Sequence, residues 1–273
     1  MPAIQSLKKQ LRGIRSTQKL TKAMRTVSTV KFSKLNGLYS GYAAYGRQCR
    51  AMLDTFGEAF SDTLHIADPE APAVVLVMAS NKGLCGSFNA EILNFALEKL
   101  PGLGPVLLVP CGRKAVNFFR NKKMIAEKEV VFGDVPAFEE SSALLNTIID
   151  WRRSGKAARV YAIYPRYVNM MTQEPELSEL LLAADGKPGN LALLVPDRDT
   201  VVERIAEDVF RAMFYELVLQ SALGAQAATL MTMRSAYDTA TEYCEELEGQ
   251  INRLRQSTVT ADVIETSVER EDP

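Results

Sequence analysis

The chain has 273 residues, of which 47% are hydrophobic and 24% are charged, and its formal net charge is −1. These are ordinary values for a globular protein, and the nearly neutral total excludes a uniformly basic nucleic-acid-binding protein. The charges are unevenly placed, however. Residues 1–53 hold eleven Lys and Arg and no acidic residue, whereas residues 201–273 hold six basic and fourteen acidic residues. The two ends of the chain therefore carry opposite charge.

Cysteine usage and hydropathy narrow the class of protein further. The four cysteines lie far apart with no CxxC pair, so neither a zinc site nor a disulfide framework is predicted, and a reducing compartment fits best. No apolar run approaches the roughly 20 residues that a bilayer-spanning helix needs. The first twenty residues are basic and amphipathic, like a mitochondrial transit peptide, which leaves a removable leader and a mature helix as alternatives.

The placement of proline divides the chain into three segments. No proline occurs between Pro2 and Pro69 or between Pro196 and Pro273. Because proline removes a helical hydrogen bond and clashes with the preceding turn, both ends can form long helices, whereas the middle has to be a turn-rich domain.

Residues 1–60 are predicted to form the N-terminal helix of a coiled coil. Apolar residues at heptad spacing define one face and then change phase, which is typical of a coiled-coil discontinuity. The first set is Ile4, Leu7, Leu11 and Ile14, and the set after the phase change is Leu20, Met24, Val27, Lys31, Lys34 and Leu38.

Residues 70–196 are predicted to form a central α/β domain in which strands and helices alternate. Continuous apolar strands are expected at 73–79, 105–109 and 159–164, with helices at 90–100, 113–121 and 141–153. Such strands are typical of a sheet that is covered on both faces. The pattern therefore predicts three layers around a mostly parallel sheet.

Residues 200–260 are predicted to form the C-terminal helix, and residues 261–273 an acidic tail. Thr200 and Glu203 have the spacing of a capping box, and a helix over 201–257 would be roughly 85 Å long. Packing the two terminal helices against each other in antiparallel fashion would bury both seams and place the basic helix beside an acidic one. The C-terminal seam comprises Ile205, Val209, Ala212, Glu216, Leu219, Leu223, Gln226, Leu230, Met233, Tyr237, Ala240, Cys244, Leu247, Ile251 and Leu254.

The segment most typical of an enzyme is Ser80–Asn89, SNKGLCGSFN, directly after the first predicted strand. A glycine-containing turn there could aim backbone N–H groups at a phosphate, although it lacks the spacing of a P-loop or a dinucleotide fold. Cys85 could be reactive if Lys82 lowers the pKa of its thiol, but a small side chain in a packed turn is the simpler interpretation. The only histidine, His65, precedes a proline-containing linker, so no acid–base pair, metal or cofactor is predicted.

Two other functional classes remain open on these features alone. An α/β enzyme could hold a phosphorylated ligand with Ser80–Asn89 and use its helices only to dimerise. Residues 1–53 could neutralise the phosphates of a nucleic acid, but their aromatic residues cluster late instead of interleaving with the basic ones, which favours a solvated or partner-facing basic face.

Three motifs resemble one known family. TQKLTKAM, Thr17–Met24, resembles the amino-terminal signature of the gamma subunits of rotary F-type (F1Fo) ATP synthases. GLCG, Gly83–Gly86, looks like the conserved loop of that family, and Arg255 and Gln256, followed by two threonines, resemble its carboxyl-terminal helix motif. The matches cover essentially the whole chain and begin within the first helix, which favours a mature helix over a removable leader.

The resemblance implies a non-catalytic rotor shaft that needs no cofactor. Its terminal helices would form an antiparallel coiled coil inside the alpha3beta3 catalytic ring, and its Rossmann-like α/β domain would lie near the epsilon subunit and the membrane c-ring. No nucleic acid and no direct membrane span are implied. The shaft would couple proton or sodium transport to ATP synthesis or hydrolysis, as a peripheral part of the F1 sector at the cytoplasmic face of a bacterial inner membrane.

The resemblance also implies contact residues. Met24 would lie near the lever of a beta subunit, Arg255 and Gln256 near the beta-subunit loop that catches the rotor, and Lys82–Gly86 near the stator or epsilon. Departures from the family pattern at Ala225, at Thr229 and in the acidic tail suggest a divergent branch. The full set of implied partner contacts is Thr17, Gln18, Lys22, Met24, Lys82, Gly83, Cys85, Gly86, Arg255 and Gln256.

Overall fold

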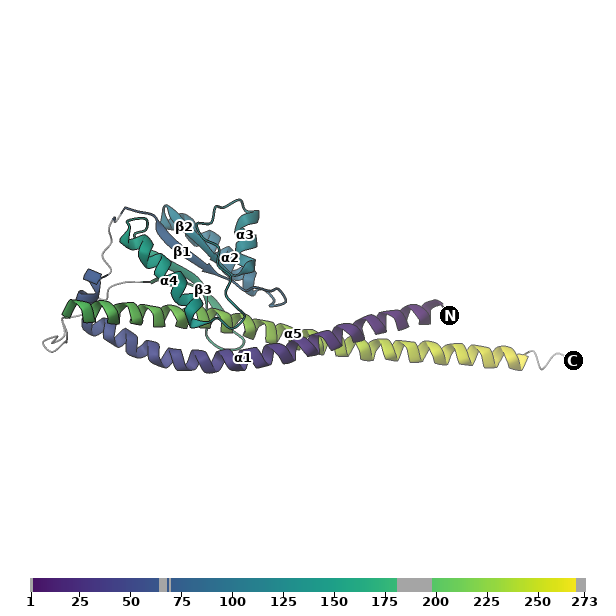
Figure 1. Ribbon diagram of the computed structural model, residues 1–273. Coiled ribbons are helices and arrows are strands. Elements are labelled where there is room, and N and C mark those ends of the chain that lie inside the picture. The colour runs from purple at the N-terminus through teal and green to yellow at the C-terminus, as the bar shows by residue number, and fades with distance from the viewer. Residues whose placement is uncertain (1, 64–67, 69, 181–197, 269–273) are drawn as a thin grey trace. The chain divides into compact units, whose positions relative to one another are not determined.

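The computed structural model describes residues 2–63, 68, 70–180 and 198–268 (Figure 1). Two long helices, α1 (Pro2–Thr63) and α5 (Arg198–Val268), lie at the two ends of the chain. The chain divides into two compact units, one of residues 1–27 with 230–273 and one of residues 28–229, and both helices contribute to each unit. None of the helices in the described ranges is both long and apolar enough to cross a bilayer.

Some sequence expectations concern residues at the edges of these ranges. His65 and residues 269–273 of the acidic tail lie outside the described residues, as do the side chains of Thr200 and Glu203. Because α5 begins at Arg198, Thr200 lies inside the helix and is not its N-cap, so that expectation was wrong.

The middle of the chain forms the predicted alternation of strands and helices, with one strand that was not predicted. The sheet has the order β2-β1-β3-β4; β1 pairs in parallel with β2 and β3, and β4 pairs antiparallel to β3. The mostly parallel sheet is therefore confirmed. The elements are β1 (Ala73–Met78), α2 (Phe88–Lys99), the 3₁₀ helix η1 (Leu100–Leu103), β2 (Val106–Cys111), α3 (Arg113–Asn121), α4 (Phe138–Arg153), β3 (Val160–Tyr167) and β4 (Gln173–Leu180).

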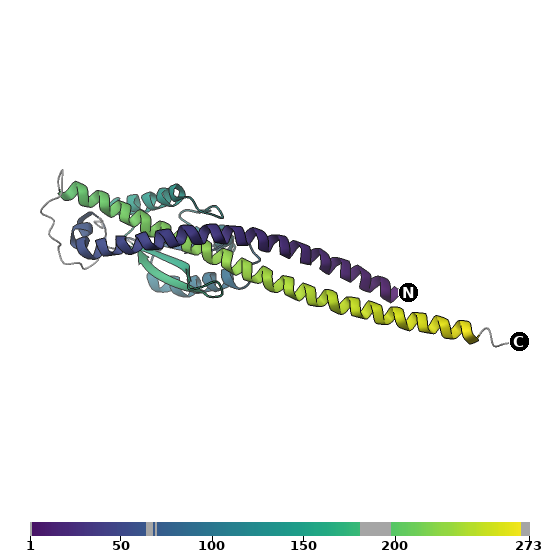
Figure 2. The same ribbon diagram turned by 90° about the horizontal axis from the view of Figure 1, so that it is seen from below.

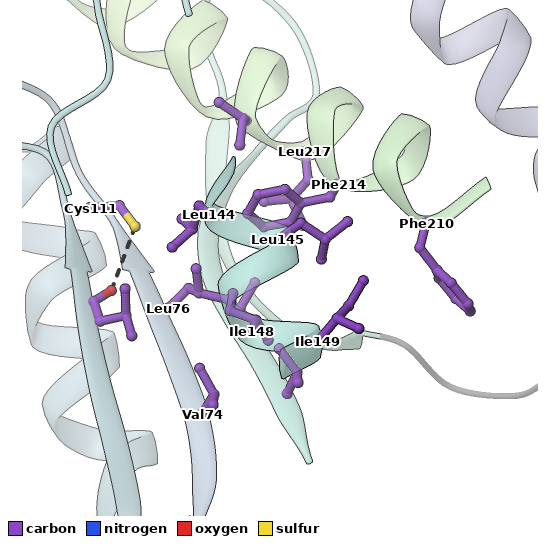
Figure 3. Close-up of a cluster of buried hydrophobic side chains, with 14 of the residues drawn as sticks. Val74, Leu76, Cys111, Leu144, Leu145, Ile148, Ile149, Phe210, Phe214 and Leu217 are labelled. Carbon is purple, nitrogen blue, oxygen red and sulfur yellow. Dashed lines mark hydrogen bonds between the residues drawn. The ribbon is translucent and has the colours of Figure 1, made fainter. Parts of the chain in front are cut away.

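Helices cover both faces of this sheet, so the three-layer architecture is confirmed (Figure 1). Successive residues of a strand point to opposite faces. Val75 and Val77 of β1 pack with α2 and α3, whereas Val74 and Leu76 pack with α4 and α5. Figure 3 shows this second cluster, in which Leu145 and Ile148 of α4 meet Phe214 and Leu217 of α5.

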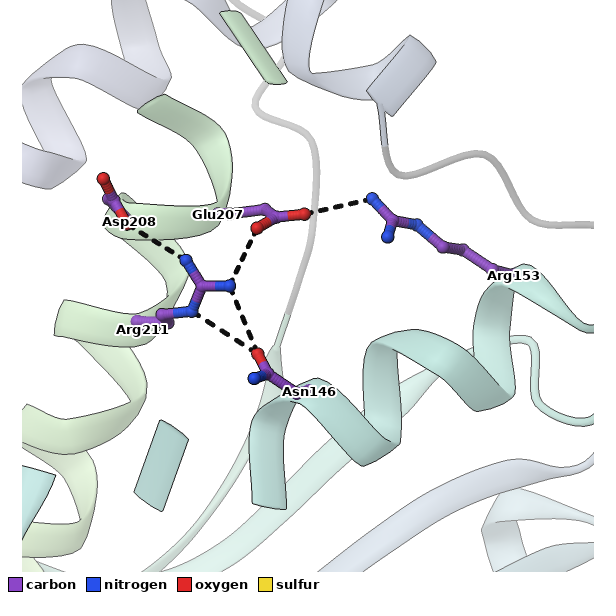
Figure 4. Close-up of polar contacts among 5 residues, drawn as sticks. All are labelled: Asn146, Arg153, Glu207, Asp208 and Arg211. Atoms are coloured by element: carbon purple, nitrogen blue, oxygen red, sulfur yellow. Dashed lines mark hydrogen bonds and ion pairs between the residues drawn. The ribbon is translucent and has the colours of Figure 1, made fainter. Parts of the chain in front are cut away.

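Polar contacts join α4 to α5 beside this cluster (Figure 4). Glu207 of α5 accepts hydrogen bonds from Arg153 of α4 at 3.1 Å and from Arg211, one turn along α5, at 2.8 Å. Arg211 also donates to Asp208 at 3.0 Å and to Asn146 of α4 at 3.3 Å. The guanidinium of Arg211 thus spans the boundary between the two helices.

The part of α5 in the unit of residues 28–229 is buried on more than one side. Phe210 and Phe214 face α4 and the sheet, whereas Tyr215, Leu219 and Leu223 pack against Leu35 and its neighbours on α1. A single heptad seam therefore does not describe this part of the helix. The sequence expectation was too narrow here because α5 also forms part of a layer of the α/β domain.

In the unit of residues 1–27 and 230–273, α1 and α5 form an antiparallel pair (Figure 2). Leu11 of α1 packs in a buried cluster with Cys244 and Leu247 of α5. Polar contacts follow in antiparallel order: Arg15 donates to Glu248 at 2.6 Å, Gln18 donates to Thr241 at 2.8 Å, and Arg25 lies 5.0 Å from the ring centre of Tyr237. The predicted antiparallel pairing is confirmed here.

The predicted phase change in α1 was wrong. Leu20 and Val27 are 59% and 54% exposed, whereas Thr21 and Ser28 are buried at 6% exposure each. The heptad that begins at Leu11 therefore continues without interruption to Leu35, but its inward positions Thr21 and Ser28 hold small polar side chains. Thr21 is accommodated because its hydroxyl donates to the Gln18 carbonyl at 3.0 Å. Apolar periodicity instead predicts that Leu20 and Val27 face inward, and the predicted phase was wrong for this reason.

Leu11 and Leu20 of α1 allow a test of this heptad phase, because they are the same residue type but Leu11 is buried and Leu20 is exposed. We expect Leu11→Ala to lower the free energy of unfolding of the helix pair by about 2–4 kcal/mol, because it leaves a cavity against Cys244 and Leu247. Leu20→Ala should change it by less than about 0.5 kcal/mol. Denaturant unfolding followed by helical circular dichroism measures both, and a larger loss at Leu20 would contradict the structure.

Candidate partner-contact site

The loop between β1 and α2 is held by hydrogen bonds among its own side chains. The backbone N–H and hydroxyl of Ser80 donate to Asn89 Oδ1 at 3.0 Å and 2.9 Å. Asn81 donates to the Phe132 carbonyl at 2.7 Å and accepts from the backbone N–H of Arg113 at 3.2 Å. In the GLCG loop, defined here as Ser80–Asn89, the side chains of Ser80, Asn81 and Asn89 are thus hydrogen-bonded within the protein.

This geometry favours the packed turn over the reactive thiol. Cys85 is 3% exposed, and its sulfur lies 3.0 Å from Asn89 Nδ2. The ammonium group of Lys82 lies against Asp134, and Lys82 approaches the thiol through its backbone carbonyl, 3.9 Å away. Within the described residues, no group of three or more His, Cys, Asp or Glu side chains comes together to hold a metal ion.

The tip of the loop has an unusual backbone. Leu84 has a φ of 64° and is 57% exposed, and Gly86 has a φ of 61°. A left-handed conformation suits Gly86 but costs a leucine roughly 1–2 kcal/mol. Gly83 does not share this conformation, and a Cβ atom placed on it would meet Lys114 Nζ at 3.6 Å, an ordinary contact. The loop therefore holds an apolar side chain in solvent at an energetic cost, which is typical of functional sites.

Asp134 links the GLCG loop to α1. Its carboxylate accepts hydrogen bonds from Lys82 of the loop at 2.7 Å and from Lys31 of α1. Burial raises the pKa of Asp134, but the hydrogen bonds from Lys31 and then Lys82 outweigh it and hold the pKa below its usual value. The carboxylate is therefore charged at neutral pH and shared by two ammonium groups.

The segment that carries Asp134 also contacts α5. The Tyr215 hydroxyl donates to the Pro136 carbonyl at 2.9 Å. The ring of Tyr215 meets those of Phe138 and Tyr42 edge-on, with centroids 5.3 Å and 4.6 Å apart. We call residues Phe132–Ala137 the connecting segment, because they contact the GLCG loop, α1 and α5.

The residues expected on the long helices differ in accessibility. Thr17 and Lys22 of α1 are exposed, Met24 is half-buried, and Gln18 is engaged with Thr241. Arg255 and Gln256 of α5 are exposed and follow Ile251, the last residue of the apolar cluster with α1. The other four expected contact residues lie on the GLCG loop, in the unit of residues 28–229.

Sequence reasoning missed Asp134 and its partner Lys31. The two are 103 positions apart, and no motif connects them. Gly133 and Pro136 mark a turn around Asp134, but this signal predicts a loop and does not identify a bridging carboxylate.

Known proteins match this chain over nearly its whole length. A family model described as ATP synthase matches residues 3–267. The chain is 30% identical to the ATP synthase gamma chain of Symbiobacterium thermophilum, over 95% of this chain and 94% of that one. It is 29% identical to the ATP synthase gamma chain of Desulforudis audaxviator, over 97% of each.

This chain belongs to the ATP synthase gamma-chain family. Its fold is also similar to that of a chain in the rotor of the Euglena gracilis mitochondrial ATP synthase in rotational state 1, with a TM-score of 0.68 at 16% identity, covering 94% of this chain and 99% of that one. A chain of the Tetrahymena thermophila mitochondrial ATP synthase central stalk and c-ring structure gives a TM-score of 0.63 at 19% identity, covering 80% and 99%. Within the gamma-chain family, the GLCG loop and the terminal helices are the segments that the sequence motifs single out.

The strain at Leu84 predicts the effect of a glycine. We expect Leu84→Gly to leave the free energy of unfolding unchanged or to raise it by up to about 1 kcal/mol, because glycine adopts a positive φ without a steric penalty. Leu20→Gly, at an equally exposed position inside a helix, should lower it by about 1 kcal/mol. Equilibrium denaturation compares the two variants, and a marked destabilisation by Leu84→Gly would contradict the conformation described.

The depressed pKa of Asp134 predicts an effect at acid pH. A carboxyl whose pKa is lower in the folded state stabilises the protein above its unfolded pKa of about 3.9, and this contribution disappears as the pH falls through the folded pKa. We expect Asp134→Asn to be less stable than the wild type at pH 7 and to lose less stability between about pH 5 and pH 2. Thermal melts across this range measure it, and parallel pH profiles would contradict the assignment.

Proposed function

We propose that this chain is the non-catalytic rotor shaft of a rotary ATP synthase, coupling ion flow through the membrane sector to ATP synthesis or hydrolysis at the alpha3beta3 ring. The observation that carries the proposal is the antiparallel packing of α1 against α5 in a chain of the gamma-chain family. The fold it shares with rotor and central-stalk chains supports the same role.

The surface charges of the terminal pair suit an asymmetric shaft. Lys8, Arg12, Lys19 and Lys22 are exposed on α1, and within residues 230–261 of α5 the exposed acidic side chains include Glu242, Glu245 and Glu246. The α1 side of the pair is therefore basic, whereas α5 carries an acidic group at Glu242–Glu246 between the exposed Arg234 and Arg253, so beta subunits placed around the pair would meet different charges. Such differential contact is the physical requirement for imposing different conformations on identical subunits.

The contacts of the shaft must favour one beta-subunit conformation over another by a substantial free energy. Driving a beta subunit from 1:99 to 99:1 between two conformations takes a discrimination of about 5.5 kcal/mol. A single exposed ion pair contributes only about 0–1 kcal/mol. The shaft must therefore act through several contacts at once, and rotation would pass the same set of contacts from one beta subunit to the next.

We assign the contact residues in two groups. Thr17, Lys22 and Met24 of α1, with Arg255 and Gln256 of α5, face the ring, and Gln18 acts indirectly by fixing α1 against Thr241. Lys82, Gly83 and Gly86 contact the stator side or the epsilon subunit, and the buried Cys85 supports that loop from within. Epsilon and the c-ring complete the partner set.

The rest of the proposal concerns organisation and location. Residues 1–60 and 200–260 serve as the shaft helices and residues 70–196 as the α/β domain on the epsilon and c-ring side. Residues 261–273 form an acidic tail, whose first part continues α5 as far as Val268. The chain is held at the cytoplasmic face of a bacterial inner membrane through its partners. No step of the mechanism requires a catalytic group in this chain, because the shaft transmits force by contact.

Arg255 and Gln256 provide a test with a control on the same helix. We expect Arg255→Ala with Gln256→Ala to lower ATP hydrolysis by the assembled complex about tenfold, a change equivalent to about 1.4 kcal/mol, without unfolding the isolated chain. Asn252→Ala with Arg253→Ala alters exposed residues one turn away and should have a smaller effect. Co-expression with alpha and beta subunits, followed by a turnover assay, measures both. Failure of the wild-type chain to enter the ring would refute the shaft itself.

A further inference from the structure

A single carboxylate joins the GLCG loop to one of the long helices. Asp134, 24% exposed at its side chain, lies between Lys31 of α1, 29% exposed, and Lys82 of the loop, 66% exposed. The side of this arrangement that faces α1 is thus the more protected from solvent, and the side that faces the loop is open. Shielding from water strengthens an ion pair. The Lys31–Asp134 pair is therefore stronger than the more exposed Lys82–Asp134 pair.

The connecting segment accepts hydrogen bonds from two adjacent residues of the GLCG loop. Asn81 donates to the Phe132 carbonyl at 2.7 Å, and Lys82 donates to Asp134 at 2.7 Å. The same segment contacts α5 through Pro136 and the hydroxyl of Tyr215. Aromatic rings from both long helices pack beside the α5 end of the segment, Tyr215 of α5 and Tyr42 of α1, and the Lys31–Asp134 pair adds the polar contact that joins the segment and the loop to α1.

We propose that Asp134 is a positioning residue that couples the GLCG loop to α1, so that a force applied to the loop by a partner reaches α1 through Lys82, Asp134 and Lys31. This inference rests on the proposed shaft function and assigns one path for the force within it. Partly exposed ion pairs such as these add little to stability, so we expect the effect of Asp134 on coupling to exceed its effect on folding.

Ion-pumping assays on the assembled complex test the proposal. We expect Asp134→Asn and Lys31→Met each to lower ATP-driven ion pumping about three- to tenfold, and to lower ATP hydrolysis by less. The double variant should be no worse than either single variant, because both changes break the same link. Asp134→Glu, which keeps the charge, should restore most of the pumping.

The matched control is Glu129→Gln, which breaks the Arg120–Glu129 ion pair of the same α/β domain at 2.9 Å. It should leave the ratio of pumping to hydrolysis at the wild-type value. Thermal melts of the isolated chains should differ by no more than a few degrees, which separates transmission from folding.

The outcomes distinguish this inference from the function on which it rests. A wild-type pumping ratio in Asp134→Asn, additive losses in the double variant, or an equal loss in Glu129→Gln would overturn the role of Asp134 and leave the shaft intact. A wild-type chain that does not assemble with the alpha and beta subunits would instead overturn the shaft function.

Discussion

The packing of α1 against α5 is the constraint on which the rest of the structure depends. Arg15 and Glu248, 233 positions apart, are joined by a hydrogen bond, and Leu35 is fully buried against Leu219 and Leu223. Neither helix could bury its apolar face alone, because a long helix with one apolar stripe needs a partner for that stripe. Bringing the two ends of the chain together also forces the intervening residues to leave α1 and return to α5, which makes the α/β domain an insertion between the paired helices.

The α/β domain in turn depends on α5 for one of its layers. Phe214 and Leu217 of α5 complete the cluster formed by Leu76 of β1 and Ile148 of α4, so the sheet would be uncovered on part of that face without the long helix. Shared burial of this kind costs more to disrupt than surface ion pairs do, because large buried side chains contribute several kilocalories per mole each. In the unit of residues 28–229, α5 and the sheet therefore belong to one hydrophobic core. A force on the domain can reach α5 through packed side chains, and it can reach α1 through the packed rings of Tyr167 and Tyr39 as well as through the polar contact at Asp134.

Much of this fold was predictable from the period of the apolar residues and the placement of the prolines, and each wrong prediction has a physical cause. The central helices and the parallel strands were predictable because continuous apolar runs and helical periods alternate between prolines. Strand β4 was missed because its sequence, QEPELSEL, contains Pro175 and three glutamates, and only pairing with β3 makes it a strand. The phase of α1 was mistaken because Thr21 and Ser28 occupy inward positions that a hydrophobicity search rejects. The GLCG loop was recognisable as a candidate site from its motif. Its link to Lys31 was not, because contacts between residues far apart in the sequence depend on how the elements pack.

The phase of α1 decides which residues a partner can touch. Because Gln18 and Thr21 face α5, Leu20, Lys22 and Val27 are placed outward, and a shift of the helix by one position would rotate each of them by about 100°. Small polar side chains at the inward positions contribute less burial energy than leucine would, yet they fix the rotation of the helix, since the hydrogen bond from Gln18 to Thr241 forms in only one phase. The terminal pair thus gives up some hydrophobic stabilisation for a defined outer surface. A shaft acts through the side chains on its outer surface. A defined rotation of the helix is therefore required, because its contacts with a ring are reproducible only if the same side chains always point outward.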